Sequence, residues 1–467
     1  MWNFETLKDD NIALVQGEVQ ITYKELKAGI NEIRQILPER ALIFCLCRNT
    51  VGSIAGYLSF TEHGCVPLLL DAKISKELLN DLIRSYRPMF FWMPTSMTGD
   101  FPDYNEVFTI FDYSLVRTGI SDPYPMNEEL CVLISTSGST GGPKLVRQSY
   151  KNILANTKSI IQYLGIDEKE RAITSLPMNY VYGLSVINTH IYANACLVLT
   201  ELNPYAKGFW RLVNEESVTS FAGVPFTYEM MNKLKVFDKE MPTLQTLTQA
   251  GGKLAPELHK KIALWAEANN KRFVVMYGAS EATARMGYLP AEFSVRKEGS
   301  MGIPIPGGRF ELIDANGAPI DTPHTVGELV YFGDNVTLGY AIQGEDLIKG
   351  DENQGRLSTG DMAQYDEDGF YYIVGRKKRF LKMLGKRVNL DEVEHLLKRH
   401  LNTQDVACSG KDDELWIFIT DEALMNEVME YVYSEININR KLQKVVVIPE
   451  IPKNPSGKTL YSELTIL

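Results

Sequence analysis

The sequence predicts an α/β protein: a large N-terminal domain of doubly wound, mixed or parallel sheets with a small β-barrel, followed by a small α+β C-terminal domain. Up to about residue 300, apolar strand-like runs alternate with amphipathic helical segments. Such alternation is typical of sheets that carry helices on both faces. Between residues 300 and 375, glycine and proline become dense and the apolar runs shorten, which indicates the barrel. The length of 467 residues also exceeds what a single core accommodates.

The strands expected in the N-terminal part are short apolar runs, which are typical of buried strands in parallel sheets. They lie at residues 41–47, 65–70, 130–135, 195–199, 219–223 and 272–277. Segments with apolar residues at helical spacing predict helices between them, at 23–36, 74–85, 151–164 and 255–268.

The barrel and the tail are predicted from shorter patterns. The runs 309–313 and 328–332 indicate barrel strands, and Asn389 followed by Glu392 is typical of the cap of a helix. The elements expected in the tail are helices at 390–399 and 422–437 and strands at 405–409, 414–420 and 443–448. We therefore expect two domains, 1–376 with a barrel-like subregion at 300–375, and 377–467.

Composition excludes several classes of function. The net charge of −11 disfavours nonspecific binding to nucleic acid, which rewards clustered Lys and Arg. Six widely spaced cysteines without a Cys-x-x-Cys pair argue against a zinc site and suggest buried free thiols in a reducing compartment. No apolar run approaches the roughly 18 residues of a membrane span, and the start has neither a basic nor an apolar leader segment. We expect a cytoplasmic protein without a membrane span.

A turn that suits phosphate binding follows the apolar run 130–134 and precedes the helical segment 150–164. Its glycines let backbone N–H groups approach phosphate oxygens, its hydroxyls can donate to them, and its lysine adds a positive charge. Its nine residues are Thr136, Ser137, Gly138, Ser139, Thr140, Gly141, Gly142, Pro143 and Lys144. The composition of this turn favours a polyphosphate ligand, most simply ATP.

Two other interpretations of this turn exist. A Walker-type loop needs glycine before its lysine and a hydroxyl residue after it, but Pro143 and Leu145 occupy those places. A cluster of Ser, Thr and Gly is also common in flexible surface turns. These nine residues by themselves leave the second interpretation open.

Seven further segments resemble, in order, the motifs of one enzyme superfamily. They are 21–26 (ITYKEL), 176–184 (LPMNYVYGL), 250–254 (AGGKL), 277–283 (YGASEAT), 358–361 (STGD), 375–378 (GRKK) and 455–458 (PSGK). Together with the turn at 136–144, they are similar to the motifs of the adenylate-forming superfamily. That superfamily contains acyl- and aryl-CoA synthetases, adenylation domains of peptide synthetases, and luciferases. The resemblance covers essentially the whole chain.

The resemblance implies an ATP site. The residues that it assigns to ATP or AMP are Thr136, Ser137, Gly138, Ser139, Thr140, Gly141, Lys144, Gly251, Gly252, Tyr277, Gly278, Ala279, Ser280, Asp361 and Arg376. Asp361 is expected to accept hydrogen bonds from both ribose hydroxyls. Thr140 and Glu281 are expected to hold Mg²⁺, which prefers oxygen ligands.

The resemblance also implies a mobile C-terminal lid. Lys458 is expected to bridge the substrate carboxylate and ATP during adenylation, and with Thr140 and Glu281 it forms the expected catalytic set. Lys378 is expected to be the hinge on which the tail rotates, which withdraws Lys458 and admits the thiol.

The acid pocket differs from that of many relatives. The residues expected to line it are Asn179, Tyr180, Val181, Gly183, Val224, Pro225, Gly251 and Ala279. Many acyl- and aryl-CoA synthetases have histidine where Tyr180 stands, and tyrosine does not titrate near neutral pH. Asn179, Tyr180 and Val181 carry no negative charge to pair with an ammonium group, which argues for an acid without an α-amino group. The small and apolar residues Val224, Pro225, Gly251 and Ala279 suggest an aliphatic or compact aryl acid.

The implied activity is AMP-forming ligation of an acid to a thiol. The acid attacks the α-phosphorus of Mg-ATP to give an acyl-adenylate and pyrophosphate, and coenzyme A then displaces AMP. We therefore expect ATP, Mg²⁺ and coenzyme A as cofactors. One alternative keeps adenylation but loads the phosphopantetheine arm of an acyl carrier protein. Another is a nucleotide-binding regulator without catalysis, which the presence of Lys144, Glu281, Asp361, Arg376 and Lys458 disfavours. The sequence leaves the oligomeric state open.

Overall fold

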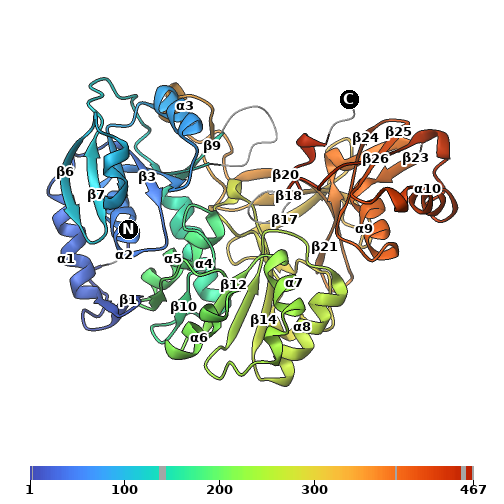
Figure 1. The fold of residues 1–467 in the computed structure, drawn as a ribbon, viewed down its shortest axis with the longest axis horizontal. Coiled ribbons are helices and arrows are strands. Elements are labelled where there is room, and N and C mark those ends of the chain that lie inside the picture. The colour runs from blue at the N-terminus through green and yellow to red at the C-terminus, as the bar shows by residue number, and fades with distance from the viewer. Residues whose placement is uncertain (3, 136–143, 384–385, 454–458, 465–467) are drawn as a thin grey trace. The chain divides into compact units, whose positions relative to one another are not determined.

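A computed structural model describes residues 1–2, 4–135, 144–383, 386–453 and 459–464 (Figure 1). It divides into two compact units. Of the described residues, the first unit comprises those up to 135 and those within 144–309 and 331–357, and the second comprises those within 310–330 and 358–464. The predicted domain boundary at residue 376 stays a prediction.

The first unit contains a nine-stranded sheet in the order β16-β15-β14-β13-β12-β10-β11-β1-β2. Its strands are β1 (Ile12–Gln16), β2 (Val19–Thr22), β10 (Arg171–Ile173), β11 (Cys196–Val198), β12 (Ser220–Gly223), β13 (Thr246–Gln249), β14 (Arg272–Tyr277), β15 (Gly287–Tyr288) and β16 (Ile303–Pro304). The strands from β14 to β1 run parallel, whereas β15, β16 and β2 pair antiparallel at the edges. The carboxyl ends of the parallel strands therefore share one edge of this sheet.

An eight-stranded sheet completes the first unit, in the order β19-β9-β8-β4-β3-β5-β7-β6. Its strands are β3 (Leu42–Cys47), β4 (Val66–Asp71), β5 (Phe90–Pro94), β6 (Asn105–Ile110), β7 (Tyr113–Arg117), β8 (Leu130–Ser135), β9 (Leu145–Ser149) and β19 (Gly339–Ala341). All six residues of β3 are buried, as expected for a strand with helices on both faces. β8 and β9 pair antiparallel, with Ser135 opposite Leu145, so the segment 136–144 connects two neighbouring strands.

Helices cover both sheets of the first unit. They are α1 (Tyr23–Arg34), α2 (Val51–His63), α3 (Lys76–Tyr86), α4 (Tyr150–Leu164), α5 (Val181–Tyr192), α6 (Lys207–Glu215), α7 (Pro225–Lys233) and α8 (Pro256–Ala268). α1 begins with a capping box between Thr22 and Glu25, and α4 with one between Ser149 and Asn152. In Figure 1, α7 and α8 lie beside β12 and β14, and α4 contacts α5.

Among its described residues, the second unit contains three small sheets and two helices. A four-stranded sheet has the order β17-β18-β20-β21, and the others are β22-β23 and β24-β25-β26. The elements are β17 (Arg309–Ile313), β18 (Gly327–Phe332), β20 (Arg356–Tyr365), β21 (Tyr371–Arg376), β22 (Phe380–Met383), β23 (Lys386–Asn389), α9 (Leu390–His400), β24 (Val406–Lys411), β25 (Glu414–Ile419), α10 (Met425–Ser434) and β26 (Gln443–Val447). α9, α10 and the β24–β26 sheet enclose one apolar core.

Short 3₁₀ turns connect several elements. They are η1 (Thr95–Asp100), η2 (Val236–Asp238), η3 (Ser280–Ala282), η4 (Ala291–Phe293), η5 (Gly344–Ile348), η6 (Lys377–Arg379), η7 (Glu422–Leu424), η8 (Arg440–Leu442) and η9 (Tyr461–Glu463). Among the described residues, no helix is both long and apolar enough to cross a bilayer. All six cysteines are free and buried.

The predicted α/β fold class is confirmed, and each predicted strand and helix has a counterpart in the structure. Two details differ. The helix predicted at 422–437 is the turn η7 followed by the shorter helix α10. Asn389 caps α9 by accepting a hydrogen bond from the backbone N–H of Asp391, and the reciprocal bond expected from Glu392 does not accompany it. The strands β17, β18, β20 and β21 form a four-stranded sheet, and the barrel-like subregion at 300–375 stays a prediction.

Candidate active site

The predicted phosphate loop is only partly described. Thr136, Ser137, Gly138, Ser139, Thr140 and Gly141 lie outside the described residues. Lys144 is described, and its ammonium nitrogen lies 5.9 Å from the centroid of the Tyr340 ring. That distance allows a cation–π interaction.

Tyr340 lies between Lys144 and Glu281, the carboxylate predicted to bind Mg²⁺. It lies on β19, directly opposite Val146 of β9, and therefore beside the end of the phosphate loop. Its hydroxyl donates a hydrogen bond of 2.5 Å to the Glu281 carboxylate. Burial and the neighbouring Glu281 raise the pKa of Tyr340, so its hydroxyl keeps its proton at neutral pH. One side chain thus faces Lys144 with its ring and Glu281 with its hydroxyl.

Glu281 lies on η3, just beyond the carboxyl end of β14, where ligands bind in open α/β sheets. The backbone N–H of Thr337 donates to the carbonyl of Glu281 at 3.0 Å. The buried amide of Asn335 donates to the carbonyl of Ala282 at 2.8 Å. Glu281 is therefore held on a fixed backbone.

The segment around Glu281 fits a bound Mg²⁺. Mg²⁺ is typically held by one or two carboxylates together with substrate phosphates and water. Glu281 supplies such an oxygen, and the described residues contain no cluster of three or more acidic, His or Cys side chains that would suggest a fully protein-bound metal. Thr140, the other predicted ligand, lies outside the described residues.

Gly278 shows why this turn tolerates no larger residue. A Cβ atom at Gly278 would lie 1.6 Å from the carbonyl oxygen of Ala284. The predicted adenine-site residues Tyr277, Ala279 and Ser280 flank this close approach, between the end of β14 and the start of η3. The glycine of the motif is thus explained by packing of the chain on itself.

The predicted acid-pocket residues lie around the start of α5. Tyr180 precedes that helix, which contains Val181 and Gly183, while Asn179 lies in the preceding turn. Val224 is the buried N-cap of α7, and Pro225 occupies its first turn.

The side chain of Tyr180 packs against Gly251, the first of the two adjacent glycines Gly251 and Gly252. Gly251 has a φ of +87°, and a Cβ atom there would lie 2.6 Å from the Tyr180 hydroxyl. The carbonyl of the neighbouring Gly252 accepts a hydrogen bond of 2.9 Å from the side chain of Gln249. Burial raises the pKa of Tyr180, so this aromatic gate stays neutral. The structure therefore brings Tyr180, Val224 and Gly251 together.

Asn49 fixes the loop before Tyr180. Its amide donates to the carbonyls of Thr174 and Leu176 at 3.2 and 3.1 Å, and its carbonyl accepts from the N–H of Met178 at 3.1 Å. Sequence reasoning missed Asn49 because its partners lie more than 120 positions away. It missed Tyr340 because that role depends on the pairing of β19 with β9.

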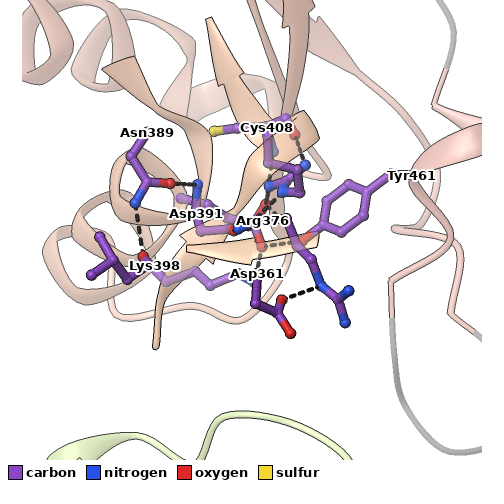
Figure 2. A network of polar contacts seen from close by, with 10 residues as sticks. Asp361, Arg376, Asn389, Asp391, Lys398, Cys408 and Tyr461 are labelled. Atoms are coloured by element: carbon purple, nitrogen blue, oxygen red, sulfur yellow. Dashed lines mark hydrogen bonds and ion pairs between the residues drawn. The ribbon is translucent and has the colours of Figure 1, made fainter. Parts of the chain in front are cut away.

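In the second unit, Asp361 and Arg376 are cross-strand neighbours on β20 and β21 (Figure 2). The Arg376 Nε lies 2.7 Å from the Asp361 carboxylate, whose side chain is only 6% exposed. The N–H of Asp361 also bonds to the Thr359 hydroxyl at 3.1 Å. Asp361, predicted to bind the ribose, and Arg376, predicted to contact the ribose or a phosphate, are thus adjacent.

A network of polar contacts continues from Arg376 into the tail (Figure 2). The N–H of Arg376 donates to Asp391 at 3.2 Å, and the Asp391 carboxylate also pairs with Arg379. Arg379 pairs in turn with Glu394, which accepts a hydrogen bond from Tyr461. Lys458 lies outside the described residues, and of the hinge residue Lys378 only the backbone, in η6, is described.

Comparison with solved structures shows that this fold is a known one. The o-succinylbenzoate CoA synthetase from Bacillus subtilis, solved with its acyl-adenylate intermediate, has a similar fold, with a TM-score of 0.80 at 21% identity, covering 100% of this chain and 98% of that one. The same enzyme with ATP and a magnesium ion matches with a TM-score of 0.77 at 21% identity, covering 99% and 98%.

The sequence comparisons show the family of this protein. The AMP-binding enzyme family model matches residues 2–341, so the chain belongs to that family. The 2-succinylbenzoate–CoA ligase of Bacillus pumilus is 24% identical over 469 residues, which covers 96% of this chain and 93% of the relative. The predicted family and the predicted kind of enzyme, an AMP-forming ligase of an acid and coenzyme A, are confirmed, as are ATP, Mg²⁺ and coenzyme A as its cofactors. The individual site residues stay predictions.

Proposed function

We propose that this protein activates a carboxylic acid without an α-amino group as its acyl-adenylate, on a site centred on Lys144, Tyr340 and Glu281, and transfers the acyl group to coenzyme A. The observation that supports this site best is the position of Tyr340. It holds the Glu281 carboxylate by its hydroxyl while its ring faces the ammonium of Lys144. A cation for polyphosphate and an oxygen ligand for Mg²⁺ thus lie on either side of one tyrosine.

The adenylation step needs both the positive charge of Lys144 and the Mg²⁺ that Glu281 is proposed to bind. In the first step an oxygen of the acid forms a bond to the α-phosphorus of ATP, and the bond from that phosphorus to the bridging oxygen of pyrophosphate breaks. In the second step the sulfur of coenzyme A bonds to the acyl carbon, and AMP leaves. Bound Mg²⁺ neutralises part of the negative charge of the phosphates. Lys144 adds a fixed positive charge, which lowers the repulsion between the approaching carboxylate of the acid and the phosphates of ATP. Tyr340 orients the Glu281 carboxylate and keeps its own proton.

The acid enters beside Tyr180, according to this proposal. Tyr180, Val224 and Gly251 offer an aromatic, apolar and uncharged wall, without a carboxylate to pair with an ammonium group. The relatives' names give 2-succinylbenzoate as their acid, and this aryl keto acid is the first candidate substrate. Lys458 is proposed to act in the adenylation step, and Asp361 with Arg376 to bind the ribose. A cytoplasmic location also stays a prediction.

Acid-dependent exchange of labelled pyrophosphate into ATP tests this proposal. The purified protein, ATP, Mg²⁺ and a panel of aryl and aliphatic acids should give exchange, and coenzyme A should then yield the thioester, detected by mass spectrometry. Exchange followed by acyl transfer only to a holo-carrier protein would show the carrier-loading alternative. Absence of exchange with every acid, despite ATP binding, would show a regulator instead.

A further inference from the structure

Two neighbouring residues in the turn from β14 to β15, here called the strained pair, have backbone conformations that side chains rarely adopt. Thr283 has a φ of +50° and Ala284 a φ of +98°. A positive φ brings the Cβ atom close to the backbone, so it costs free energy at any residue other than glycine, most of all at a β-branched one such as Thr283. Two such residues in succession persist only where the surrounding structure holds them.

The strained pair lies directly after the predicted adenine-site and Mg²⁺ residues. The carbonyl oxygen of Ala284 approaches Gly278 so closely that a Cβ atom there would lie 1.6 Å from it. The N–H of Met286 donates to the carbonyl of Tyr277 at 2.8 Å, which closes the turn. Glu281 lies inside this closed turn, so the direction of its side chain depends on the conformation of the strained pair.

The side chain of Asn335 bonds to the turn on both sides of the strained pair. Its Nδ2 donates to the carbonyl of Ala282 and to that of Arg285, both at 2.8 Å. These two carbonyls belong to the residues directly before and directly after the strained pair. The backbone carbonyl of Asn335 also accepts a hydrogen bond of 2.8 Å from the hydroxyl of Thr283. Asn335 therefore holds the turn before, within and after the strained pair.

The orientation of the Asn335 amide is itself fixed. Only 3% of the surface of Asn335 is exposed, so water does not compete for its hydrogen bonds. Its Oδ1 accepts from the hydroxyl of Tyr331 at 2.7 Å, which leaves both N–H groups of the amide for the turn. The amide of Asn152 donates to the carbonyls of Asp334 and Val336 at 2.8 and 2.7 Å, and these bonds hold the backbone on either side of Asn335.

Other hydrogen bonds reach the turn from outside, but each acts at one end of it. The amide of Asn156 donates to the carbonyl of Arg285 at 2.9 Å, and the N–H of Thr337 donates to the carbonyl of Glu281 at 3.0 Å. Asn335 acts at both ends with one side chain. Without it, the strained pair would be free to relax towards negative φ, because the bonds that remain do not span it.

We propose that Asn335 is a positioning residue of the ATP and Mg²⁺ site: it keeps the strained pair at positive φ and so holds Glu281 where its carboxylate meets the hydroxyl of Tyr340. The inference rests on the proposed function, in which Glu281 binds Mg²⁺. A turn that is already in its binding conformation need not be ordered when ATP and the metal bind. Without Asn335 only a fraction of the molecules would have that conformation, and the apparent affinity for Mg-ATP would fall by this fraction.

Asn335→Leu tests the role of the amide, because leucine has a similar size but no donor. The half-saturating Mg²⁺ concentration in pyrophosphate exchange and the Kd for Mg-ATP from titration calorimetry should each rise about tenfold or more. The KM for the acid should change less. Asn188→Leu is the matched control, since Asn188 is also buried and also accepts from a tyrosine hydroxyl, that of Tyr57 at 3.0 Å. Equal rises in both variants would overturn the inference.

Ala284→Gly separates positioning from a merely structural role. Glycine adopts a positive φ without strain, so the turn should need Asn335 less. Added to Asn335→Leu, Ala284→Gly should lower the half-saturating Mg²⁺ concentration about fivefold or more, as expected when one strained backbone residue is relieved. Ala282→Gly is the matched control, at an alanine of the same turn that lies in η3, and should not restore binding. Absence of rescue by Ala284→Gly would overturn the inference.

The remaining outcomes are also assigned. A lower stability of Asn335→Leu to urea with unchanged Mg²⁺ and Mg-ATP binding would make Asn335 a packing residue only. If this variant does not fold, Tyr331→Phe replaces it, because it removes only the bond that orients the amide: the Kd for Mg-ATP should rise about threefold and fall again with Ala284→Gly, and an unchanged Kd would overturn the inference. A wild-type protein that binds Mg-ATP but shows no exchange with any acid would contradict the proposed function, while calorimetry would still decide the role of Asn335.

Discussion

The carboxylate of Glu394 accepts a hydrogen bond of 3.1 Å from the hydroxyl of Tyr461, which lies 67 positions further along the chain. Glu394, on α9, also accepts from Lys398 at 2.7 Å and from the N–H of Cys408 at 2.9 Å. Arg379 pairs with Glu394 at 3.1 Å and lies over the Tyr461 ring. This one buried carboxylate therefore connects β24 and the turn η9 to α9.

Tyr461→Phe should weaken the attachment of the terminal segment. Tyr461 lies three residues beyond Lys458, so a loosened segment should lower kcat for pyrophosphate exchange more than it raises the KM for ATP. The lost hydrogen bond to a charged acceptor should also cost about 1.5–3 kcal/mol in the free energy of unfolding, measured by urea denaturation. Tyr433→Phe, at an exposed tyrosine of α10, is the control. Equal kcat in wild type and Tyr461→Phe would contradict this prediction.

Tyr340→Phe should weaken the binding of the Mg²⁺ that catalysis requires. The ring that faces Lys144 remains, but the hydroxyl that orients Glu281 is lost. Loss of a group that orients a metal ligand typically costs about 10–100-fold in metal affinity. A Mg²⁺ titration of pyrophosphate exchange should show a half-saturating concentration raised at least about tenfold. An unchanged titration would mean that Glu281 needs no orientation by Tyr340.

Asn49→Ala should weaken the binding of the acid more than the binding of ATP. The variant removes three hydrogen bonds from the loop 174–178, which leads to Tyr180. We expect the KM for the acid to rise about tenfold or more while the KM for ATP changes less, because this loop leads to Tyr180 in the predicted acid pocket. Asn203→Ala, at an asparagine that bonds to the N–H of Tyr205 on an exposed turn, is the matched control. A larger effect on ATP than on the acid would contradict this prediction.

His259 should make the protein less stable in mild acid. It is buried on α8, where its Nδ1 accepts the N–H of Gly299 at 3.1 Å and its Nε2 lies 3.0 Å from the Ser294 hydroxyl. Burial lowers its pKa from 6.5 to about 4. The native protein therefore keeps this imidazole neutral, while the unfolded chain takes up a proton below pH 6.5. The contribution of neutral His259 to the free energy of unfolding is fully present above about pH 6.5. It is lost as the pH falls towards 4, by a total of about 3 kcal/mol.

Urea unfolding at pH 7.5 and 4.5 measures this loss. His259→Gln should lose less unfolding free energy between the two values than the wild-type protein does, because glutamine does not titrate. His324→Gln, at a surface histidine that pairs with Glu367, is the control. The same loss in wild type and His259→Gln would show that other groups cause the acid sensitivity.

The sequence predicts those parts of the protein whose signal is local. The strands such as β8 and β14 are contiguous apolar runs, and the glycine of the 277–283 motif has a local packing reason at Gly278. The helices α2 and α5 escape prediction by helical spacing, because nearly all their residues are buried and no polar face marks the period. Tyr340 and Asn49 escape for another reason: their partners are brought together only by the pairing of distant strands and loops.

Lys458→Ala should separate the two half-reactions. By resemblance, Lys458 acts on the carboxylate and ATP only during adenylation, so the variant should lose pyrophosphate exchange by at least about 100-fold, a typical loss when one group that stabilises transition-state charge is removed. Thioester formation from supplied acyl-adenylate and coenzyme A should remain within a few-fold of wild type. Lys453→Ala is the matched control, since Lys453 lies in the same segment and contacts Asp405 at 3.5 Å. Equal loss of both half-reactions would mean that the residue supports the fold of the tail, and the assignment of Lys458 to one step would fail.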